Sequence, residues 1–377
     1  MQNQLSSRRD FIFKTTAAGT ALLLNPIFSW AGKEEDKIAK IVAKTFGIDT
    51  HNHVDVPFNA EDFIGQQYDL AGELKKSGLG AVCMTFSVDR PALKQSGDAY
   101  NRFITSLNEQ DVILKANNIK RALNYSDIKK ARQNKKPVVI QSVEGGHFLE
   151  GKIERLSEAY NRGLRLLGLL HDNDAIPPLG DIYTNPAQYG GLTDLGARLI
   201  KECNRLGILI DLTHCSDDTI NEALKISTKP LMVSHTSLNT QLGKNENMNK
   251  MMMPRLIKKE QAKIVAESGG VIGVWKHLTE TPAEYVQNIL AMVDVVGVDH
   301  VCIGTDTKLA TITKAGAENK PARVGEQTNN VWQNQSKGFY FEAVENMLQA
   351  GFSEKEIGKI GSGNFLKIFE AATFKNK

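Results

Sequence analysis

The segment 191–216, GLTDLGARLIKECNRLGILIDLTHCS, contains one complete helix-and-strand unit. Its first half, Asp194–Leu206, places apolar side chains three or four residues apart, in one stripe along a helix: Leu195, Leu199, Ile200, Cys203 and Leu206. Its second half, Ile208–His214, is a short run rich in Ile and Leu, which is typical of a strand buried on both faces. A helix that leads directly into such a strand predicts an α/β fold with a parallel sheet.

Comparable apolar runs occur eight times along the chain: Phe46–His51, Leu79–Phe86, Pro137–Glu144, Leu164–His171, Ile208–His214, Leu231–His235, Gly270–Trp275 and His300–Asp306. Further amphipathic helices are expected between them, at 70–76, 218–226, 259–268 and 282–295. Strand and helix alternating eight times favours a closed (β/α)8 barrel, the TIM barrel, over an open sheet. The polar stretch Thr307–Lys337 follows the eighth run and is expected to be an active-site loop.

The amino terminus carries an export signal. Residues 7–14, SRRDFIFK, match a twin-arginine motif, and a short apolar stretch and the small-residue site Ser29-Trp30-Ala31 follow. A membrane anchor is the alternative, but the apolar stretch is broken at Asn25-Pro26 and is too short to span roughly 30 Å of hydrocarbon. We therefore expect a signal peptide at 1–31, a single catalytic domain at 32–377, and export to the periplasm with no anchor after processing.

Charge and cysteine content exclude several classes of partner and site. The chain has 46 basic and 43 acidic residues, a near balance that predicts no nucleic acid or anionic membrane as partner. The four cysteines include no C-x-x-C pair and lie mostly in or beside apolar runs, so we expect buried free thiols.

Five of the eight runs end in side chains suited to a metal site: His51 and His53, Glu144, His214, His235 and Asp306. The carboxyl ends of barrel strands open onto one face, so these side chains are expected to converge there. Each histidine taken alone fits a loop or satisfied core position equally well, and only the set of them together indicates a metal site. The set is rich in nitrogen, which favours zinc over magnesium or calcium and leaves manganese and iron open.

Two further side chains are candidates for the chemistry itself. Asp306 can act as general acid and base, although a helix cap or loop aspartate is the alternative. His171 ends the fourth run and can stabilise an oxyanion, with a structural histidine as its alternative. No comparable role is expected for His147, His277 or His300, and His300 begins a strand at the opposite face.

These motifs resemble the membrane dipeptidase family of the amidohydrolase superfamily. The similar stretches cover nearly the whole chain after the signal: 47–55 (GIDTHNHVD), 142–150 (SVEGGHFLE), 160–174, 191–216, 230–237, 296–306 and 361–370. The resemblance implies a barrel with two zinc ions. It assigns His51 and His53 to one zinc, His214 and His235 to the other, and Glu144 as the bridge. It likewise implies that His171 contacts the substrate carbonyl, that Arg255 binds the substrate carboxylate, and that Asp306 is the acid/base.

The chain departs from the family pattern at two places. His53 stands where the best-known members have aspartate, which raises the net charge of the site by one unit and should weaken its hold on the cation. After Asp306 the chain continues Thr307-Lys308 where the family usually has Phe-Asp-Gly, which leaves substrate preference open.

The expected reaction is hydrolysis of a dipeptide, including one with a D-residue at its C-terminal position, by a hydroxide that bridges the metals. One alternative is another amidohydrolase reaction, on a lactone, a cyclic amide or a β-lactam. A second alternative is a periplasmic metal- or ligand-binding protein without turnover. The partners expected are a small peptide substrate and a second copy of the chain in a homodimer.

Overall fold

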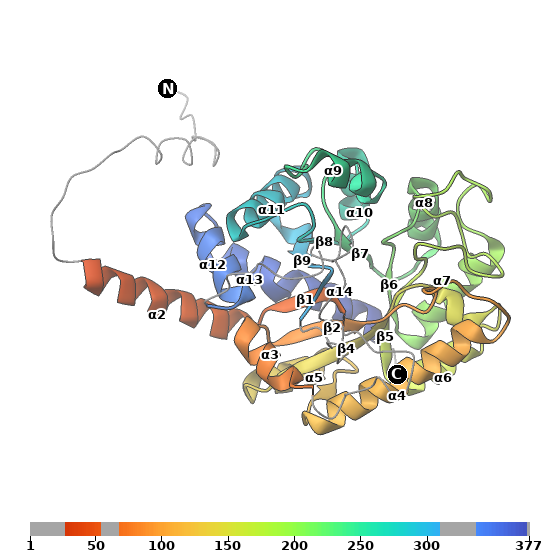
Figure 1. Ribbon diagram of the computed structural model, residues 1–377, viewed down its shortest axis with the longest axis horizontal. Coiled ribbons are helices and arrows are strands. Elements are labelled where there is room, and N and C mark those ends of the chain that lie inside the picture. Colours follow the sequence, from red (N-terminus) through yellow and green to blue (C-terminus); the bar gives the residue numbers. More distant parts are fainter. Residues whose placement is uncertain (1–26, 54–67, 310–336, 375–377) are drawn as a thin grey trace, which may run out of the picture.

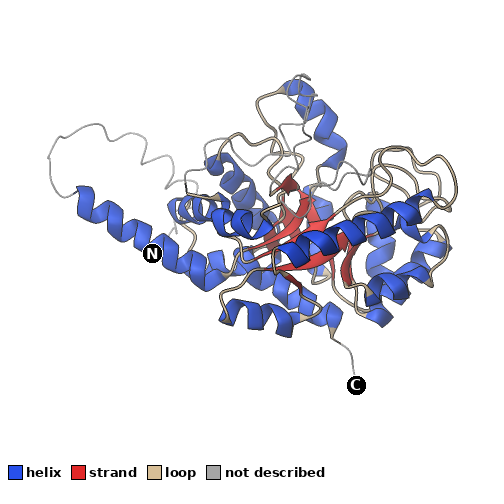
Figure 2. Cartoon of the chain, turned by 60° about the horizontal axis from the view of Figure 1, so that its bottom comes forward, coloured by secondary structure: helices blue, strands red, loops and turns tan. Residues whose placement is uncertain are grey.

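The computed structural model describes residues 27–53, 68–309 and 337–374 and confirms the predicted (β/α)8 barrel (Figure 1). Figure 2 shows the strands gathered in the middle of the molecule with helices outside them. The eight predicted apolar runs supply the eight parallel barrel strands: β1 Ile48–His53, β2 Ala81–Thr85, β4 Val138–Val143, β5 Leu164–Gly168, β6 Leu209–Asp211, β7 Leu231–Thr236, β8 Val271–Val274 and β9 Val301–Ile303.

The sheet closes because its first and last barrel strands pair, with Asp49 of β1 opposite Ile303 of β9. Two short strands lie beside this ring: β3 Lys120–Arg121 pairs with β4, and β10 Thr307–Lys308 pairs with the end of β1. The β1–β2 register shifts between Asp49 and Asn52, an irregularity of the kind found next to active sites.

The helices surround the barrel, and the five that the sequence predicts, at 70–76, 194–206, 218–226, 259–268 and 282–295, are present to within one residue. The helices are α2 Ile27–Thr45, α3 Leu70–Ser77, α4 Asp98–Ala116, α5 Tyr125–Gln133, α6 Arg155–Asn161, α7 Asp194–Leu206, α8 Asp217–Ile226, α9 Glu246–Met252, α10 Lys259–Glu267, α11 Pro282–Val296, α12 Phe339–Gln349, α13 Glu354–Gly358 and α14 Asn364–Thr373. Short helical turns lie at η3 Gly146–Leu149, η4 Met253–Arg255, η5 Val298–His300 and η7 Lys359–Gly363. The helix of the deciding segment, α7, begins where the Thr193 hydroxyl accepts from the Gly196 amide and ends at the left-handed Gly207.

The amino-terminal half of the barrel interior is apolar. Phe365 and Phe369 of α14 belong to this cluster. Each barrel strand contributes a buried side chain to it: Ile48, Cys83, Ile140, Leu166, Leu209, Met232, Val271 and Cys302. Burying one such side chain stabilises the fold by about 1.5–3 kcal/mol. This apolar layer therefore stabilises the barrel below the polar residues of the site.

Two glycines allow polar groups to cross the barrel directly above that layer. A Cβ on Gly273 or Gly304 would lie 1.8 Å from the carbonyl oxygen of Ser234. With no Cβ there, the Thr50 hydroxyl reaches the carbonyl oxygens of Ser234 and Ile303, at 2.9 and 3.0 Å. This contact ties β1 to β7 and β9 beside His51 and His235.

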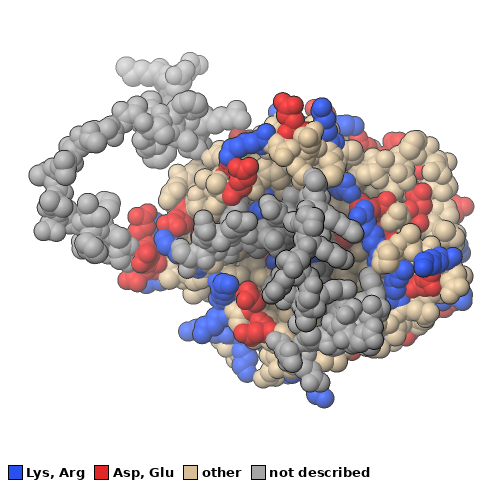
Figure 3. Space-filling model, viewed as in Figure 1, with Lys and Arg blue, Asp and Glu red and all other residues tan. Residues whose placement is uncertain are grey.

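The four cysteines are buried and free, as predicted. The predicted cleavage site after Ala31 falls within α2, and the twin-arginine motif lies outside the described residues, as does most of the predicted loop 307–337. No helix in the described ranges is long and apolar enough to cross a membrane. On the face seen in Figure 3, acidic and basic side chains are interspersed.

Candidate metal centre and active site

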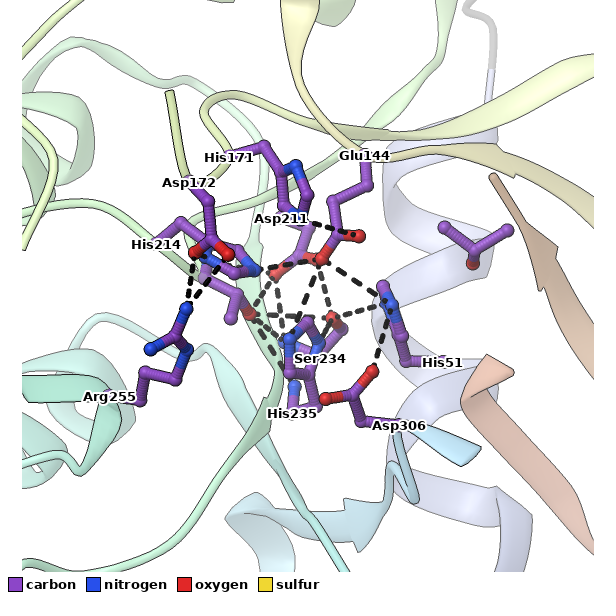
Figure 4. A network of polar contacts seen from close by, with 12 residues as sticks. His51, Glu144, His171, Asp172, Asp211, His214, Ser234, His235, Arg255 and Asp306 are labelled. Atoms are coloured by element: carbon purple, nitrogen blue, oxygen red, sulfur yellow. Dashed lines mark hydrogen bonds and ion pairs between the residues drawn. The ribbon is translucent and has the colours of Figure 1, made fainter. Parts of the chain in front are cut away.

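The structure brings the predicted ligands together at the carboxyl ends of the barrel strands, around the carboxylate of Glu144 (Figure 4). An imidazole Nε2 atom approaches a Glu144 oxygen from each of five histidines. The distances are 2.8 Å for His214, 3.2 Å for His171, 3.5 Å for His51, 3.6 Å for His235 and 3.8 Å for His53. Side chains from distant parts of the sequence therefore share one small region.

Glu144 reaches this position because the backbone after β4 turns sharply. Gly145 has a φ of 89°, and a Cβ there would lie 2.4 Å from Nδ1 of His147 and 3.2 Å from Cβ of His171. A side chain at Gly168 on the neighbouring strand would lie 3.2 Å from the Glu144 Cα. The two glycines thus let the Glu144 turn and the strand before His171 pack in close contact.

The outer nitrogens of these imidazoles have partners of their own. His171 Nδ1 lies 2.6 Å from the Asp89 carboxylate, and His214 Nδ1 lies 2.7 Å from the Tyr183 hydroxyl. Such contacts on Nδ1 orient the rings and leave Nε2 facing inward, as in metal-binding histidines.

The charges at the centre are strongly coupled. Burial alone would raise the pKa of Glu144, but the imidazoles around it, His171 first, lower that pKa well below its usual value. Burial lowers the pKa of His51 and His235. Burial acts in the same direction on His214, but Glu144 and Asp172 raise the pKa of His214 to about 10. The buried carboxylate therefore draws positive charge into the site.

This donor set fits a divalent metal. The Nε2 atoms of His51 and His53 lie 3.2 Å apart, so their lone pairs repel unless a proton or a cation lies between them. The potential ligand atoms of His51, His53 and Asp306 lie within 4.8 Å of one another, and so do those of Glu144, His214 and His235. Two adjoining groups of mixed nitrogen and carboxylate donors match what zinc prefers.

Asp306 faces the first of these groups. It follows β9 with a φ of 53°, a left-handed conformation that is uncommon for residues other than glycine and often marks a functional position. Its Oδ1 lies 3.2 Å from His53 Nε2. Burial acts to raise the pKa of Asp306, but His235 and His277 lower it well below its usual value.

His277, for which no comparable role is expected from the sequence, nevertheless lies against Asp306. Its Nε2 lies 3.3 Å from Oδ2 and 3.0 Å from the backbone oxygen of Asp306, and its ring stacks on Trp275. His277 follows β8 by three residues, so the strand-end argument applied to the other histidines also predicts this location. His147 instead contacts the backbone oxygen of Asn173. His300 lies at the amino end of β9, away from the site as expected, and contacts the backbone oxygen of Gly270.

Arg255, the predicted carboxylate-binding residue, lies at the edge of the same cluster. Its Nη2 donates to both oxygens of Asp172, each at 2.8 Å, and Asp172 Oδ1 lies 3.3 Å from His214 Nδ1. Arg90 also pairs with Asp172. Asp172 and Arg90 were not predicted from the sequence, although the position of Asp172 directly after His171, at a strand end, indicates a place at the site.

Comparisons with known proteins agree with this picture. The sequence model described as membrane dipeptidase (peptidase family M19) matches residues 35–377.

Several solved structures share the fold. The probable dipeptidase PvdM from Pseudomonas aeruginosa is 15% identical with a TM-score of 0.74, and the match covers 90% of this chain and 98% of that one. An amidohydrolase from Pseudomonas aeruginosa is 20% identical with a TM-score of 0.69, covering 89% and 98%. A metallo peptidase from Rhodobacter sphaeroides, liganded with a phosphinate mimic of L-Ala-D-Ala, is 16% identical with a TM-score of 0.66, covering 86% and 99%. At these identities the structural likeness concerns the fold alone.

Proposed function

The chain belongs to the membrane dipeptidase family and is a metallo-dipeptidase, and from that premise we propose that it cleaves dipeptides at a centre of two zinc ions. The proposed substrates include dipeptides with a D-residue at the C-terminal position. The observation that carries the proposal is the convergence of five imidazole Nε2 atoms on the buried Glu144 carboxylate.

In the proposed centre, His51 and His53 would hold one zinc, His214 and His235 would hold the other, and Glu144 would offer its carboxylate to both. Bound zinc would supply a Lewis acid for the scissile carbonyl and would lower the pKa of a bound water. The position of the donors at strand ends supports this assignment, because side chains on regular elements are held in place more precisely than side chains on loops.

The substrate is held at two groups, its free carboxylate and its scissile carbonyl. Arg255 binds the free carboxylate of the dipeptide, a task suited to the planar guanidinium group. Asp172 orients Arg255 by accepting two hydrogen bonds from Nη2. The contact between His171 and Asp89 supports the oxyanion role of His171. The Asp89 carboxylate accepts a hydrogen bond from Nδ1 and so orients the ring, and Nε2 can donate to the oxyanion.

Asp306 moves the proton. It accepts a proton from the attacking water and returns it to the leaving amine. This role is supported by its position, with Oδ1 3.2 Å from His53 Nε2.

The proposed location is the periplasm, reached through the twin-arginine signal at 1–31. The support is the Arg8-Arg9 motif and the small-residue site ending at Ala31. Amino-terminal sequencing of the protein from a periplasmic fraction tests this, and a chain that begins at Met1 in the cytoplasm would contradict it.

A substrate panel on protein of measured zinc content tests the proposed reaction. The panel contains matched pairs of dipeptides with L- or D-residues at the C-terminus, their C-terminal amides, and a lactone, a cyclic amide and a β-lactam. We expect two zinc ions per chain and turnover of free-carboxylate dipeptides. Turnover confined to the cyclic compounds would favour the alternative amidohydrolase reaction, and bound zinc without any hydrolysis would favour a binding protein.

A further inference from the structure

The hydroxyl of Ser234 lies between two histidines of the proposed metal centre and a buried carboxylate. Ser234 is a fully buried residue of β7, directly before His235. Its Oγ lies 2.9 Å from Nδ1 of His235, 3.2 Å from Nδ1 of His51 and 2.5 Å from Oδ2 of Asp211 (Figure 4). The Thr213 hydroxyl is a fourth and longer contact at 3.3 Å, and the three shorter contacts already match the one proton and two lone pairs of a serine hydroxyl.

The contacts of Asp211 determine where the serine proton points. Oδ1 of Asp211 accepts from the amides of Thr213 and Ser234, at 3.0 and 2.8 Å, and from the Thr213 hydroxyl at 2.7 Å. The hydroxyl of Ser234 is the fourth donor, on Oδ2. The other three donors all lie on Oδ1, and the Ser234 hydroxyl gives its proton to Oδ2 in the shortest of its contacts, at 2.5 Å.

The two imidazoles must then donate to Ser234. With its proton on Asp211, the serine oxygen only accepts, and the hydrogens come from Nδ1 of His51 and Nδ1 of His235. Each ring is thereby held in the Nδ1–H tautomer, with the lone pair on Nε2. Those Nε2 atoms face Glu144 at 3.5 and 3.6 Å, on the side of the proposed metals.

We propose that Ser234 is a positioning residue that sets the tautomer of one histidine from each half of the metal centre. The inference rests on the proposed two-metal function. His51 belongs to one ligand pair and His235 to the other. A single hydroxyl, held by Asp211, therefore keeps one histidine of each pair in the tautomer whose Nε2 can bind metal. Partners behind metal-binding histidines commonly contribute 10–100-fold to metal affinity.

A different role for Asp211 has to be weighed, because its carboxylate, His51 and His235 could themselves form a cation site. The contacts argue against it. The oxygens of Asp211 are occupied by four protein donors, and Ser234 lies between Asp211 and both rings. A cation there would have to displace hydrogen bonds that are already satisfied.

The test compares Ser234→Ala with the wild type by chelator competition, which reports zinc affinity at both steps of binding. We expect affinity to fall about 10–100-fold at both steps, because both halves lose their tautomer control. Ser237→Ala is the matched control: Ser237 is a buried serine three residues along whose hydroxyl has no hydrogen-bond partner among the described residues. We expect it to leave both affinities within about threefold of wild type, since no hydrogen bond to a ligand is lost.

A second measurement works on the metal-free protein and does not depend on metal affinity. Long-range proton–nitrogen NMR correlations of the imidazoles report which ring nitrogen is protonated. We expect His51 and His235 to be Nδ1–H tautomers in the wild type and mixtures in Ser234→Ala.

The outcomes separate this inference from the proposed function. Wild-type protein that binds no zinc would contradict the proposed function, while the NMR comparison would still decide the role of Ser234. Zinc affinities in Ser234→Ala equal to wild type, or unchanged tautomers, would overturn the inference alone. A third zinc per chain that Asp211→Asn removes would also overturn it, by making Asp211 a ligand.

Discussion

Replacing Asp306 by asparagine tests whether Asp306 transfers the proton without binding the metal. Asparagine keeps the volume of the side chain and one of the two oxygens, which contact His53 and His277 at 3.2 and 3.3 Å, but it cannot carry a proton between water and amine. General acid–base catalysis contributes about 10²–10⁴ in rate. We therefore expect kcat to fall by that factor, which corresponds to about 2.7–5.4 kcal/mol in the activation free energy.

The assay is steady-state hydrolysis of one dipeptide together with zinc analysis of the same preparation. Zinc content should stay at the wild-type value, because Glu144 and the four ligand histidines are unchanged. Asp299→Asn is the control, since Asp299 lies at the amino end of β9, pairs with Lys359 and should not affect kcat. A kcat within threefold of wild type would remove Asp306 from the acid/base role, and loss of one zinc would make it a ligand beside His51 and His53.

Three further changes test other parts of the account. Arg255→Gln should raise KM for free-carboxylate dipeptides about 10–100-fold and leave kcat nearly unchanged, because it removes a contact made equally in the ground and transition states; an equal rise for C-terminal amides would refute the carboxylate role. Zinc affinity should rise with pH up to about 10, because the pKa of His214 is raised to about 10 in the metal-free chain and zinc must displace its proton; calorimetry in buffers of different ionisation enthalpy measures the released protons, and zero release at pH 7 would contradict this. Gly304→Ala should lower the free energy of unfolding by about 1–3 kcal/mol, because its Cβ would lie 1.8 Å from the Ser234 carbonyl oxygen. Gly358→Ala, whose nearest neighbour would be 3.7 Å away, should be close to neutral in the same thermal unfolding experiment, and equal loss in both variants would refute the steric argument.

The barrel strands and the histidines around Glu144 could be predicted from the sequence because they depend on local patterns. Buried parallel strands appear as short apolar runs, and the barrel brings the ends of all such runs to one face. His214 and Glu144 could therefore be expected to meet, although 70 residues separate them.

The supporting residues were harder to predict because their roles depend on contacts that sequence spacing does not encode. Asp172 becomes part of the site only because Arg255, from a turn after α9, packs against it. Ser234 looks like an ordinary strand serine until the ring orientations of His51 and His235 are known. His277 was missed because it lies beyond the apolar run that marks β8.

Anomalous X-ray scattering at the zinc edge, from crystals of the zinc-loaded protein, locates the metals directly. We expect two peaks, one beside His51 and His53 and the other beside His214 and His235, with the Glu144 carboxylate between them. A single peak, or zinc bound away from Glu144, would refute the two-metal centre.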